Sequence, residues 1–341
     1  MFRLSMTLTV LALVVIILGG YVRLSDAGLS CPDWPGCYGQ LVVPGEQDRG
    51  AAQAAFPSTP LEVGKAWKEM VHRYVAGLLG LGVLALTVIS VRRRHQAGMP
   101  VLTPCVLLAL IVFQALLGMW TVTLLLKPMV VTAHLMGGLA TGSLLSWIAL
   151  RHFGLARGWR PMPCTPSRSL FLLGSLLLIV QLTLGGWTSA NYAALACPDF
   201  PLCNGRVVPE MNLSEGFQLS RELGAGLDGK LISLEGLVAI QFVHRLGAVM
   251  TVLLLGICAV LAQRSAWSVY RLAGAAMLGL LVSQAALGVA TVLNAKPLGY
   301  AVAHNANAAL LSLSVIIMLY MSKYGPPSLV NSTSFIAAKN D

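Results

Sequence analysis

The sequence predicts an all-α integral membrane protein of about eight transmembrane helices, arranged as two tandem four-helix bundles. Three observations support this prediction: a low content of charge, a series of long apolar runs, and an internal repeat. Of the 341 residues, 56% are hydrophobic and 11% are charged, and the mean hydropathy is +0.76. A soluble domain carries about 25% charged residues, and a charge at the centre of a membrane helix costs roughly 2.5–3.5 kcal/mol on insertion scales. The composition therefore favours a bilayer.

The apolar runs are long enough to cross a bilayer, which takes about 20 helical residues. The expected helices cover residues 4–22, 71–91, 102–125, 130–150, 169–187, 236–261, 269–293 and 300–321. Most links between them are short and polar, but residues 23–68 and 188–235 form long links. The first run also has the length of a cleavable signal peptide. We expect it to be a helix of the mature protein, because the fifth run occupies the same place in the second copy of the repeat.

The distribution of charge predicts the orientation, because lysine and arginine favour the cytoplasmic side of a membrane. Residues 92–94, 151–168 and 264–271 carry arginines and no acidic residue, whereas the two long links carry most of the acidic residues. We therefore expect a multi-pass protein of a bacterial-type inner (cell) membrane, with both termini cytoplasmic and the long loops outside. The net charge of +10 does not indicate a nucleic-acid partner, because the basic residues lie between apolar runs and form no stripe on a soluble face. Membrane lipid is the expected partner of the apolar surface.

Several short motifs occur twice in the same order, which indicates an internal duplication. CPDWPGC at residues 31–37 is answered by CPDFPLC at residues 197–203. HRYVAG from His72 is answered by HRLGAV from His244, and QALLGMWTV from Gln114 by QAALGVATV from Gln284. Chance similarity among apolar runs would repeat leucines, not the same Cys, His and Gln.

The duplication predicts the domain organisation. We expect a first four-helix unit at residues 1–152 and a second at residues 168–323. A cytoplasmic linker at residues 153–167 would join them, and a cytoplasmic tail would cover residues 324–341.

Four histidines indicate the chemistry: His72, His134, His244 and His304. Each lies near the outer end of a helix that is predicted to run inward, so their rings should share one depth. Ionisable groups inside a membrane are costly and usually functional. A single histidine could simply bond to a neighbouring helix, but two repeated pairs fit the axial ligands of two hemes better. Zinc would need more ligands nearby, and the membrane segments offer no suitable cluster.

The two copies differ beside the first histidine of each pair. Glu69 lies three residues before His72, on the same helix face, where the second copy has Gln241 before His244. This difference suggests chemistry in the first half and electron handling in the second. The alternative is that Glu69 is a first-turn acid favoured by the helix dipole.

Two further sets of polar residues have more than one interpretation. Arg73 and Arg245 could contact heme propionates or extend to the membrane interface. Gln114, Gly118 and Thr121 share one helix face, as do their counterparts in the second copy, a pattern that favours close helix packing with hydrogen bonds across the interface.

The cysteines of the two long loops form C-x5-C pairs, Cys31 with Cys37 and Cys197 with Cys203. We expect two disulfides, because both pairs lie in loops predicted to be outside, where disulfides persist. A metal site is the weaker alternative, because the spacing is loose and no histidine accompanies it. A redox role for either pair stays open. The remaining cysteines are expected to be unpaired: Cys105, Cys164 and Cys258.

At these residues the chain resembles the heme A synthase family. The resemblance rests on E-x-x-H-R at residues 69–73, on His134, on the H-R pair at residues 244–245 and on His304, and it covers nearly the full length. It implies that His72 and His134 flank heme O as the substrate and that His244 and His304 ligate heme b. It also implies that Glu69 is the catalytic carboxylate.

The resemblance implies that a ring methyl of heme O becomes the formyl group of heme A, by successive hydroxylations, for terminal oxidase biogenesis. Heme O synthase and cytochrome oxidase assembly factors are the implied protein partners, and a homo-oligomer stays open. The rival function is a diheme b-type membrane electron-transfer protein, which would explain the histidines but give the Glu69/Gln241 difference no role. A transporter would explain the repeat but not the histidine pairs.

Overall fold

The structure is a computed structural model that describes residues 1–96, 99–162, 166–223 and 231–327. Within these ranges eight helices are long and apolar enough to span a membrane, which confirms the predicted all-α membrane fold. They are α1 (Phe2–Leu24), α3 (Val63–Arg92), α4 (Leu102–Thr123), α5 (Pro128–Ala156), α6 (Pro166–Ala190), α8 (Leu234–Ala262), α9 (Ser268–Leu293) and α10 (Leu298–Lys323).

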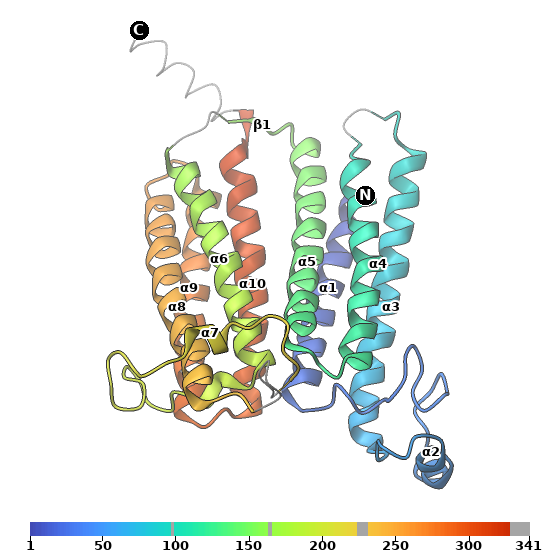
Figure 1. Cartoon of the computed structure of the whole chain (residues 1–341). Helices are drawn as coiled ribbons and strands as arrows, with labels where there is room; N and C mark the ends of the chain where they lie inside the picture. The colour runs from blue at the N-terminus through green and yellow to red at the C-terminus, as the bar shows by residue number, and fades with distance from the viewer. Residues whose placement is uncertain (97–98, 163–165, 224–230, 328–341) are drawn as a thin grey trace.

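Small elements occupy the connections. The long loop after α1 holds a 3-10 turn (Glu46–Asp48) and helix α2 (Arg49–Ala55). The long loop after α6 holds a second 3-10 turn (Ala193–Leu195) and helix α7 (Leu213–Gly216). Strands β1 (Arg160–Pro161) and β2 (Tyr324–Gly325) pair antiparallel, at the end of the molecule opposite the two long loops (Figure 1). Most of the expected tail after residue 323 lies outside the described residues.

Helix α3 begins earlier than the sequence predicted, at Val63 rather than at residue 71. The apolar criterion missed its first two turns because they carry Lys65, Lys68 and Glu69. The first turn of α3 therefore contains no acidic residue, and Glu69 lies in the second turn. The interpretation of Glu69 as a first-turn acid favoured by the helix dipole is wrong.

Local sequence also explains where helices α5 and α8 begin. Pro128 starts α5, where its missing N–H costs nothing. Ser233 caps α8 by accepting a hydrogen bond at Oγ from the Gly236 N–H, at 3.0 Å. The turns before α5 and α10 share one backbone form, with positive φ at residues 125–126 and 295–296. The duplication therefore extends to the backbone of the turns.

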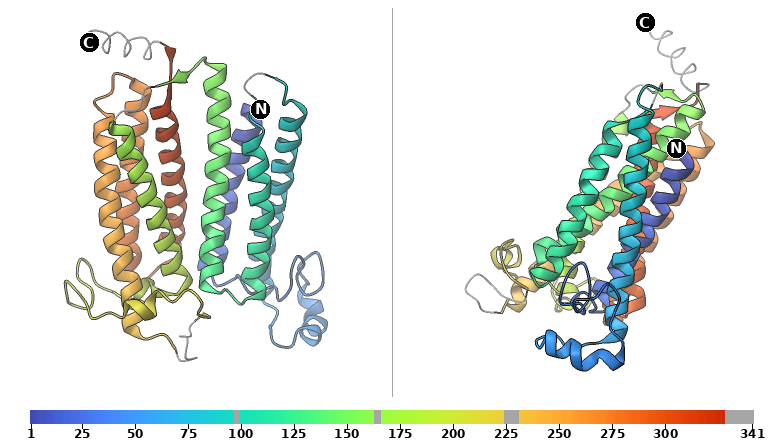
Figure 2. Two further views of the ribbon diagram at one scale, coloured as in Figure 1. Left: turned by 45° about the horizontal axis from the view of Figure 1, so that its top comes forward. Right: turned by 90° about the vertical axis from the view of Figure 1, so that its right-hand side faces the viewer.

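The spanning helices form two groups of four, visible side by side in Figure 1 and Figure 2. In the first group, α1 and α4 each contact both α3 and α5, so α3 and α5 face each other diagonally. In the second group, α6 and α9 each contact both α8 and α10, which leaves α8 and α10 as the diagonal pair. The groups meet where α10 contacts α1 and α5, and where α5 contacts α6. We call these groups the first half and the second half.

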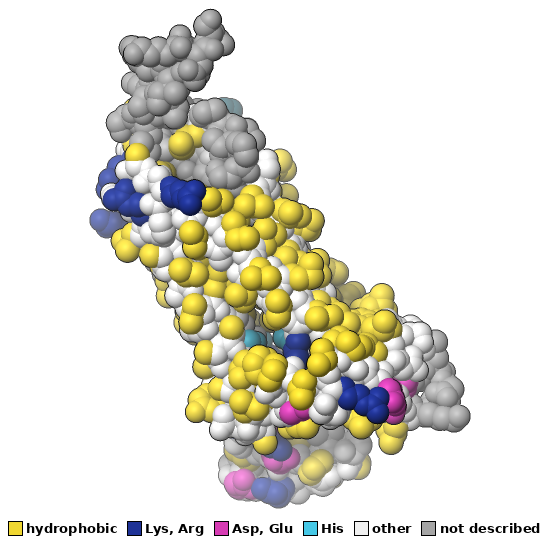
Figure 3. All heavy atoms as spheres, turned by 90° about the vertical axis from the view of Figure 1, so that its left-hand side faces the viewer, with side chains coloured by type: hydrophobic (Ala, Val, Ile, Leu, Met, Phe, Trp, Pro, Cys, Tyr) yellow, Lys and Arg dark blue, Asp and Glu magenta, His cyan; other side chains and the backbone are white. Residues whose placement is uncertain are grey.

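Both long loops lie at one end of the molecule, which we call the loop end; the N-terminus lies at the opposite end (Figure 1). Apolar side chains form a broad band between the two ends, where charged side chains gather (Figure 3). Histidine side chains are visible within this band toward the loop end. This pattern is that of a multi-pass membrane protein.

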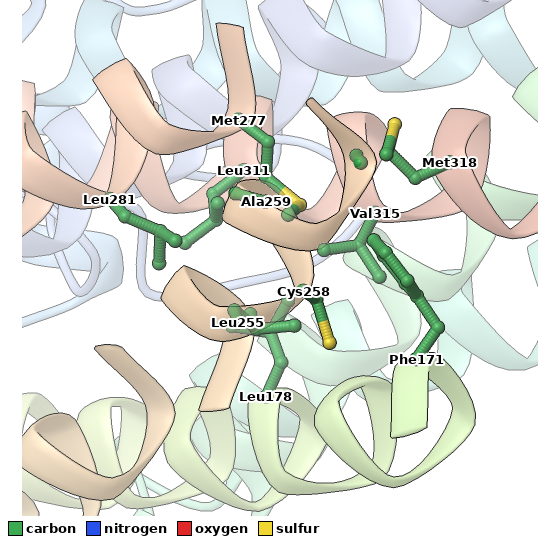
Figure 4. Packing of buried hydrophobic residues seen from close by; sticks show 11 residues of the cluster. Phe171, Leu178, Leu255, Cys258, Ala259, Met277, Leu281, Leu311, Val315 and Met318 are labelled. Atoms are coloured by element: carbon green, nitrogen blue, oxygen red, sulfur yellow. The ribbon is translucent and has the colours of Figure 1, made fainter. Parts of the chain in front are cut away.

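Each half has an apolar core that lies away from the loop end. In the second half, Phe171, Leu255, Met277 and Met318 belong to one cluster of almost fully buried side chains (Figure 4). The first half has a corresponding cluster of Leu8, Val83, Leu86, Leu107, Leu145 and Ile148. Side-chain packing therefore fills the half of each bundle opposite the loops, whereas the four histidines lie in the other half of each bundle.

Candidate functional site

The four histidines lie in two facing pairs. His72 on α3 faces His134 on α5, and His244 on α8 faces His304 on α10, in each case across the diagonal of one half. The two helices of each pair are separated by the same two neighbours, α1 and α4 in the first half and α6 and α9 in the second. The structure thus brings together the two histidines of each copy of the repeat.

Each histidine ring lies against a glycine of a neighbouring helix. The pairs are Gly19–His72, Gly118–His134, Gly185–His244 and Gly288–His304. A Cβ atom on these glycines would lie 2.9–3.4 Å from the Cε1 atom of the ring, closer than an ordinary contact. The glycines therefore make room for the rings. Gly118 and its counterpart Gly288 belong to the helix face for which the sequence predicted only close packing.

The chemistry of the histidines fits a heme. The Nδ1 atoms of His72, His134 and His304 are buried without a hydrogen-bond partner, although buried polar atoms normally have one. No cluster of three or more His, Cys, Asp or Glu that could hold a metal ion occurs among the described residues. Two facing imidazoles in an apolar bundle suit the two axial positions of a heme iron better than they suit zinc. Apolar side chains around them suit the macrocycle.

An amide network supports the second pair of histidines. Gln181 approaches His244, with 3.0 Å between its Nε2 and the ring Nδ1. Gln284 approaches His304, with 3.1 Å between its Nε2 and the ring Nε2. The Oε1 atom of Gln284 also accepts a hydrogen bond from Asn307 Nδ2, at 2.7 Å. Each amide nitrogen donates to the ring nitrogen that it approaches, so the amides hold both rings in a fixed orientation.

The first pair has fewer polar neighbours. Val15 stands at the position that corresponds to Gln181, and Gly137 at the position that corresponds to Asn307. Gln114 corresponds to Gln284, but its Nε2 atom is buried without a hydrogen-bond partner. The environments of the two pairs therefore differ although the histidines match.

Glu69 is buried and both its carboxylate oxygens are engaged. Oε2 accepts hydrogen bonds from the backbone N–H groups of Ser30 and Cys31, each at 3.0 Å. Oε1 forms an ion pair with Arg73 Nη2, at 2.6 Å. Arg73 in turn donates from Nη1 to the backbone carbonyl of Asp33, at 2.9 Å. Glu69 and Arg73 thus attach the first cysteine loop to α3, one turn from His72.

The second half holds its cysteine loop without a carboxylate. Arg245 donates to the carbonyls of Cys197, at 2.6 Å, and Leu202, at 2.8 Å. Gln241 stands where the first half has Glu69, and its Oε1 atom is buried without a hydrogen-bond partner. Both arginines therefore contact loop backbone. Contact with heme propionates stays a prediction for each of them.

Both predicted disulfides are present. Cys31 bonds to Cys37 and Cys197 to Cys203, each across a Cα–Cα distance of 4.7 Å. An aspartate organises each loop: Asp199 accepts hydrogen bonds from the N–H groups of residues 204 and 205, as Asp33 does from those of residues 38 and 39. The Gly205 N–H is the main cause that lowers the pKa of Asp199.

The remaining polar predictions have mixed outcomes. Cys105 and Cys258 are free thiols, as expected, and Cys164 lies outside the described residues. Gln284 bonds across to α10, as the packing interpretation expected. Thr121 instead bonds back to the Gly118 carbonyl of its own helix, at 2.7 Å.

Residues 2–316 match the profile of a family described as cytochrome oxidase assembly protein. A heme A synthase from Shewanella oneidensis is 40% identical over 323 residues, which cover 91% of this chain and 93% of the relative. A heme A synthase from Caulobacter vibrioides is 31% identical, over 87% of this chain and 88% of the relative. Another from Granulibacter bethesdensis is 28% identical, over 92% of this chain and 85% of the relative.

Proposed function

This chain belongs to the cytochrome oxidase assembly protein family, and from that premise we propose that it is a heme A synthase. It is an integral membrane oxidoreductase that converts a ring methyl of heme O to the formyl group of heme A, for terminal oxidase biogenesis. The observation that carries this proposal is the pair of facing histidines in each half of a chain that is 40% identical to a heme A synthase.

The two halves take different hemes in this proposal. His72 and His134 hold the substrate heme O in the first unit, residues 1–152. His244 and His304 ligate a resident heme b in the second unit, residues 168–323. The amide network around His244 and His304 supports this assignment, because fixed histidines suit a permanently bound group. The sparser surroundings of the first pair suit a substrate that enters and leaves.

When bound, the heme b supplies one-electron chemistry, and the protein supplies position and electrostatics. Glu69 places a carboxylate in a low-dielectric setting one turn from His72, where it stabilises positive charge that develops beside the reacting methyl. Its bonds to Ser30 and Cys31 also hold the first cysteine loop at the end of the site. Glu69 thus combines an electrostatic role with a positioning role.

The loop end faces outward in this proposal, and both termini are cytoplasmic. The arginines at residues 92–94 and 151–168 lie at the opposite end, and their positive charge supports this orientation. Heme O synthase makes heme O, so this enzyme is the expected protein partner that delivers the substrate. Assembly factors of cytochrome oxidase would take the product.

The test is to express the chain in cells that make heme O, and to analyse extracted hemes by chromatography and mass. We expect heme A in these cells, and heme b together with heme O or heme A in the purified protein. Heme b alone, without heme O or heme A, would instead favour the diheme electron-transfer protein.

A further inference from the structure

An unpaired amide lies beside the first pair of histidines. The Nε2 atom of Gln114 on α4 is buried without a hydrogen-bond partner. This amide lies over Gly137 of α5, so closely that a Cβ atom on Gly137 would collide with it. The backbone carbonyl of Gln114 lies beside the His134 ring. An available hydrogen-bond donor therefore stands next to the proposed substrate site.

The second half shows the same glutamine with its bonds satisfied. Gln284 receives a hydrogen bond from Asn307 and approaches His304 through its own Nε2 atom. Asn307 follows His304 by three residues, and Gly137 follows His134 by three residues. The Nε2 atom of Gln114 thus lacks a partner of the kind that His304 gives to the Nε2 atom of Gln284, and Gly137 has no side chain that could fix the amide as Asn307 does. A buried donor without a partner is unfavourable, and this one is positioned to bind an oxygen of a ligand.

The depth of the amide indicates which oxygen. Gly137 lies one turn farther from the loop end than His134, which places the Gln114 amide about 5 Å deeper than that ring. Anionic propionates belong at the polar loop end, because a charge in the apolar interior is costly. A neutral oxygen on the hydrocarbon side of the porphyrin suits the deeper position. Heme O has such an oxygen, the hydroxyl of its hydroxyethylfarnesyl side chain, where heme b has a vinyl group.

We propose that Gln114 selects heme O over heme b by donating a hydrogen bond from Nε2 to the hydroxyl of the hydroxyethylfarnesyl side chain. This inference rests on the proposed function, because it assigns heme O to the first half. It also explains the second half, where the matching amide of Gln284 bonds to Asn307 and His304 instead, and where heme b offers no hydroxyl. Gln114 is a specificity-determining residue in this view.

The experiment measures binding rather than turnover. The full chain is purified with its resident heme b from cells that do not make heme O, and the first site is titrated with heme O and, separately, with heme b. We expect wild-type protein to prefer heme O. Gln114→Leu should weaken heme O binding by about fivefold, the loss expected for one neutral hydrogen bond, and leave the added heme b unaffected.

A second variant tests the same amide without removing it. Gly137→Ala adds a methyl that displaces the Gln114 side chain, so it should also weaken heme O binding. Gly138→Ala is the matched control, because its new Cβ would meet Ile16 Cγ1 at an ordinary 3.7 Å. Its heme O affinity should match that of wild type.

Unchanged heme O affinity in both Gln114→Leu and Gly137→Ala would overturn this inference and leave the proposed function standing. An equal loss of heme O and heme b affinity in Gln114→Leu would also overturn it, because that result would mean a packing role. Failure of wild-type protein to bind heme O at all would instead contradict the proposed function.

Discussion

Glu69 and Arg73 form an ion pair of 2.6 Å, one turn apart on α3, and together they attach the first cysteine loop to the end of the helix bundle. The second half keeps the arginine as Arg245 but has Gln241 in place of the carboxylate. One buried negative charge therefore distinguishes the loop end of the first half from that of the second.

Glu69→Gln should keep the fold and the heme b spectrum but lower heme A formation by at least about tenfold, or some 1.4 kcal/mol of barrier. The amide can still accept a hydrogen bond from Ser30 or Cys31, but it brings no negative charge to the site. The measurement is chromatography of hemes from cells that make heme O and express the variant. The alcohol that the first hydroxylation of the methyl group forms should accumulate in these cells.

Gln241→Glu is the matched control for that experiment. It adds a carboxylate at the equivalent place of the second half and should leave heme A formation unchanged. Normal heme A formation by Glu69→Gln would contradict the electrostatic role and leave Glu69 as a residue that only holds the loop.

The four histidines should be inequivalent. We expect His244→Ala and His304→Ala to remove the spectrum of the resident heme b, because each removes one axial ligand. His72→Ala and His134→Ala should keep that spectrum and block conversion of heme O. Absorbance spectra of the purified variants and heme analysis of the cells measure the two effects. Equal loss of resident heme from all four variants would refute the division between the halves.

The loop cysteines should be oxidised in cells. A thiol reagent applied to unreduced membranes should miss Cys31, Cys37, Cys197 and Cys203 and should reach all four after reduction. Cys105 is an exposed free thiol and serves as the positive control for a membrane-permeant reagent. Each bond closes a loop with a sequence separation of 6, so loop-closure arithmetic gives a stabilisation of about 2–3 kcal/mol. Labelling of the four cysteines without reductant would show that the disulfides do not persist.

The sequence predicted the helices and the histidine pairs, because both depend on signals along the chain. Apolar runs locate spanning helices, and a duplication repeats its motifs in order. The start of α3 was missed because Lys65, Lys68 and Glu69 lie inside a helix that extends beyond the apolar band. No periodicity reveals such an extension.

Other features depend on contacts between residues far apart in the chain. The hydrogen bonds of Glu69 to Ser30 and Cys31 join residues separated by almost forty positions, so the sequence left its role open between a helix-start acid and a catalytic group. The Gly137/Asn307 difference is visible in the repeat, three residues after each histidine. Its consequence for Gln114 depends on the packing of α4 against α5, which places the Gln114 amide over Gly137.

A glycine of a neighbouring helix lies against each of the four histidine rings, so a larger residue at such a glycine should weaken heme binding. A Cβ atom on Gly288 would lie 3.0 Å from His304 Cε1, so Gly288→Ala should push the ring out of its position. Overpacking of this kind costs about 1–3 kcal/mol, which corresponds to a loss of heme b affinity of at least about fivefold. Gly279→Ala on the same helix is the control, because its Cβ would meet no atom within 4 Å. The measurement is heme b per chain in purified protein at limiting heme. Full heme b content in Gly288→Ala, equal to that of Gly279→Ala, would show that the close approach of α9 to His304 does not position this ligand.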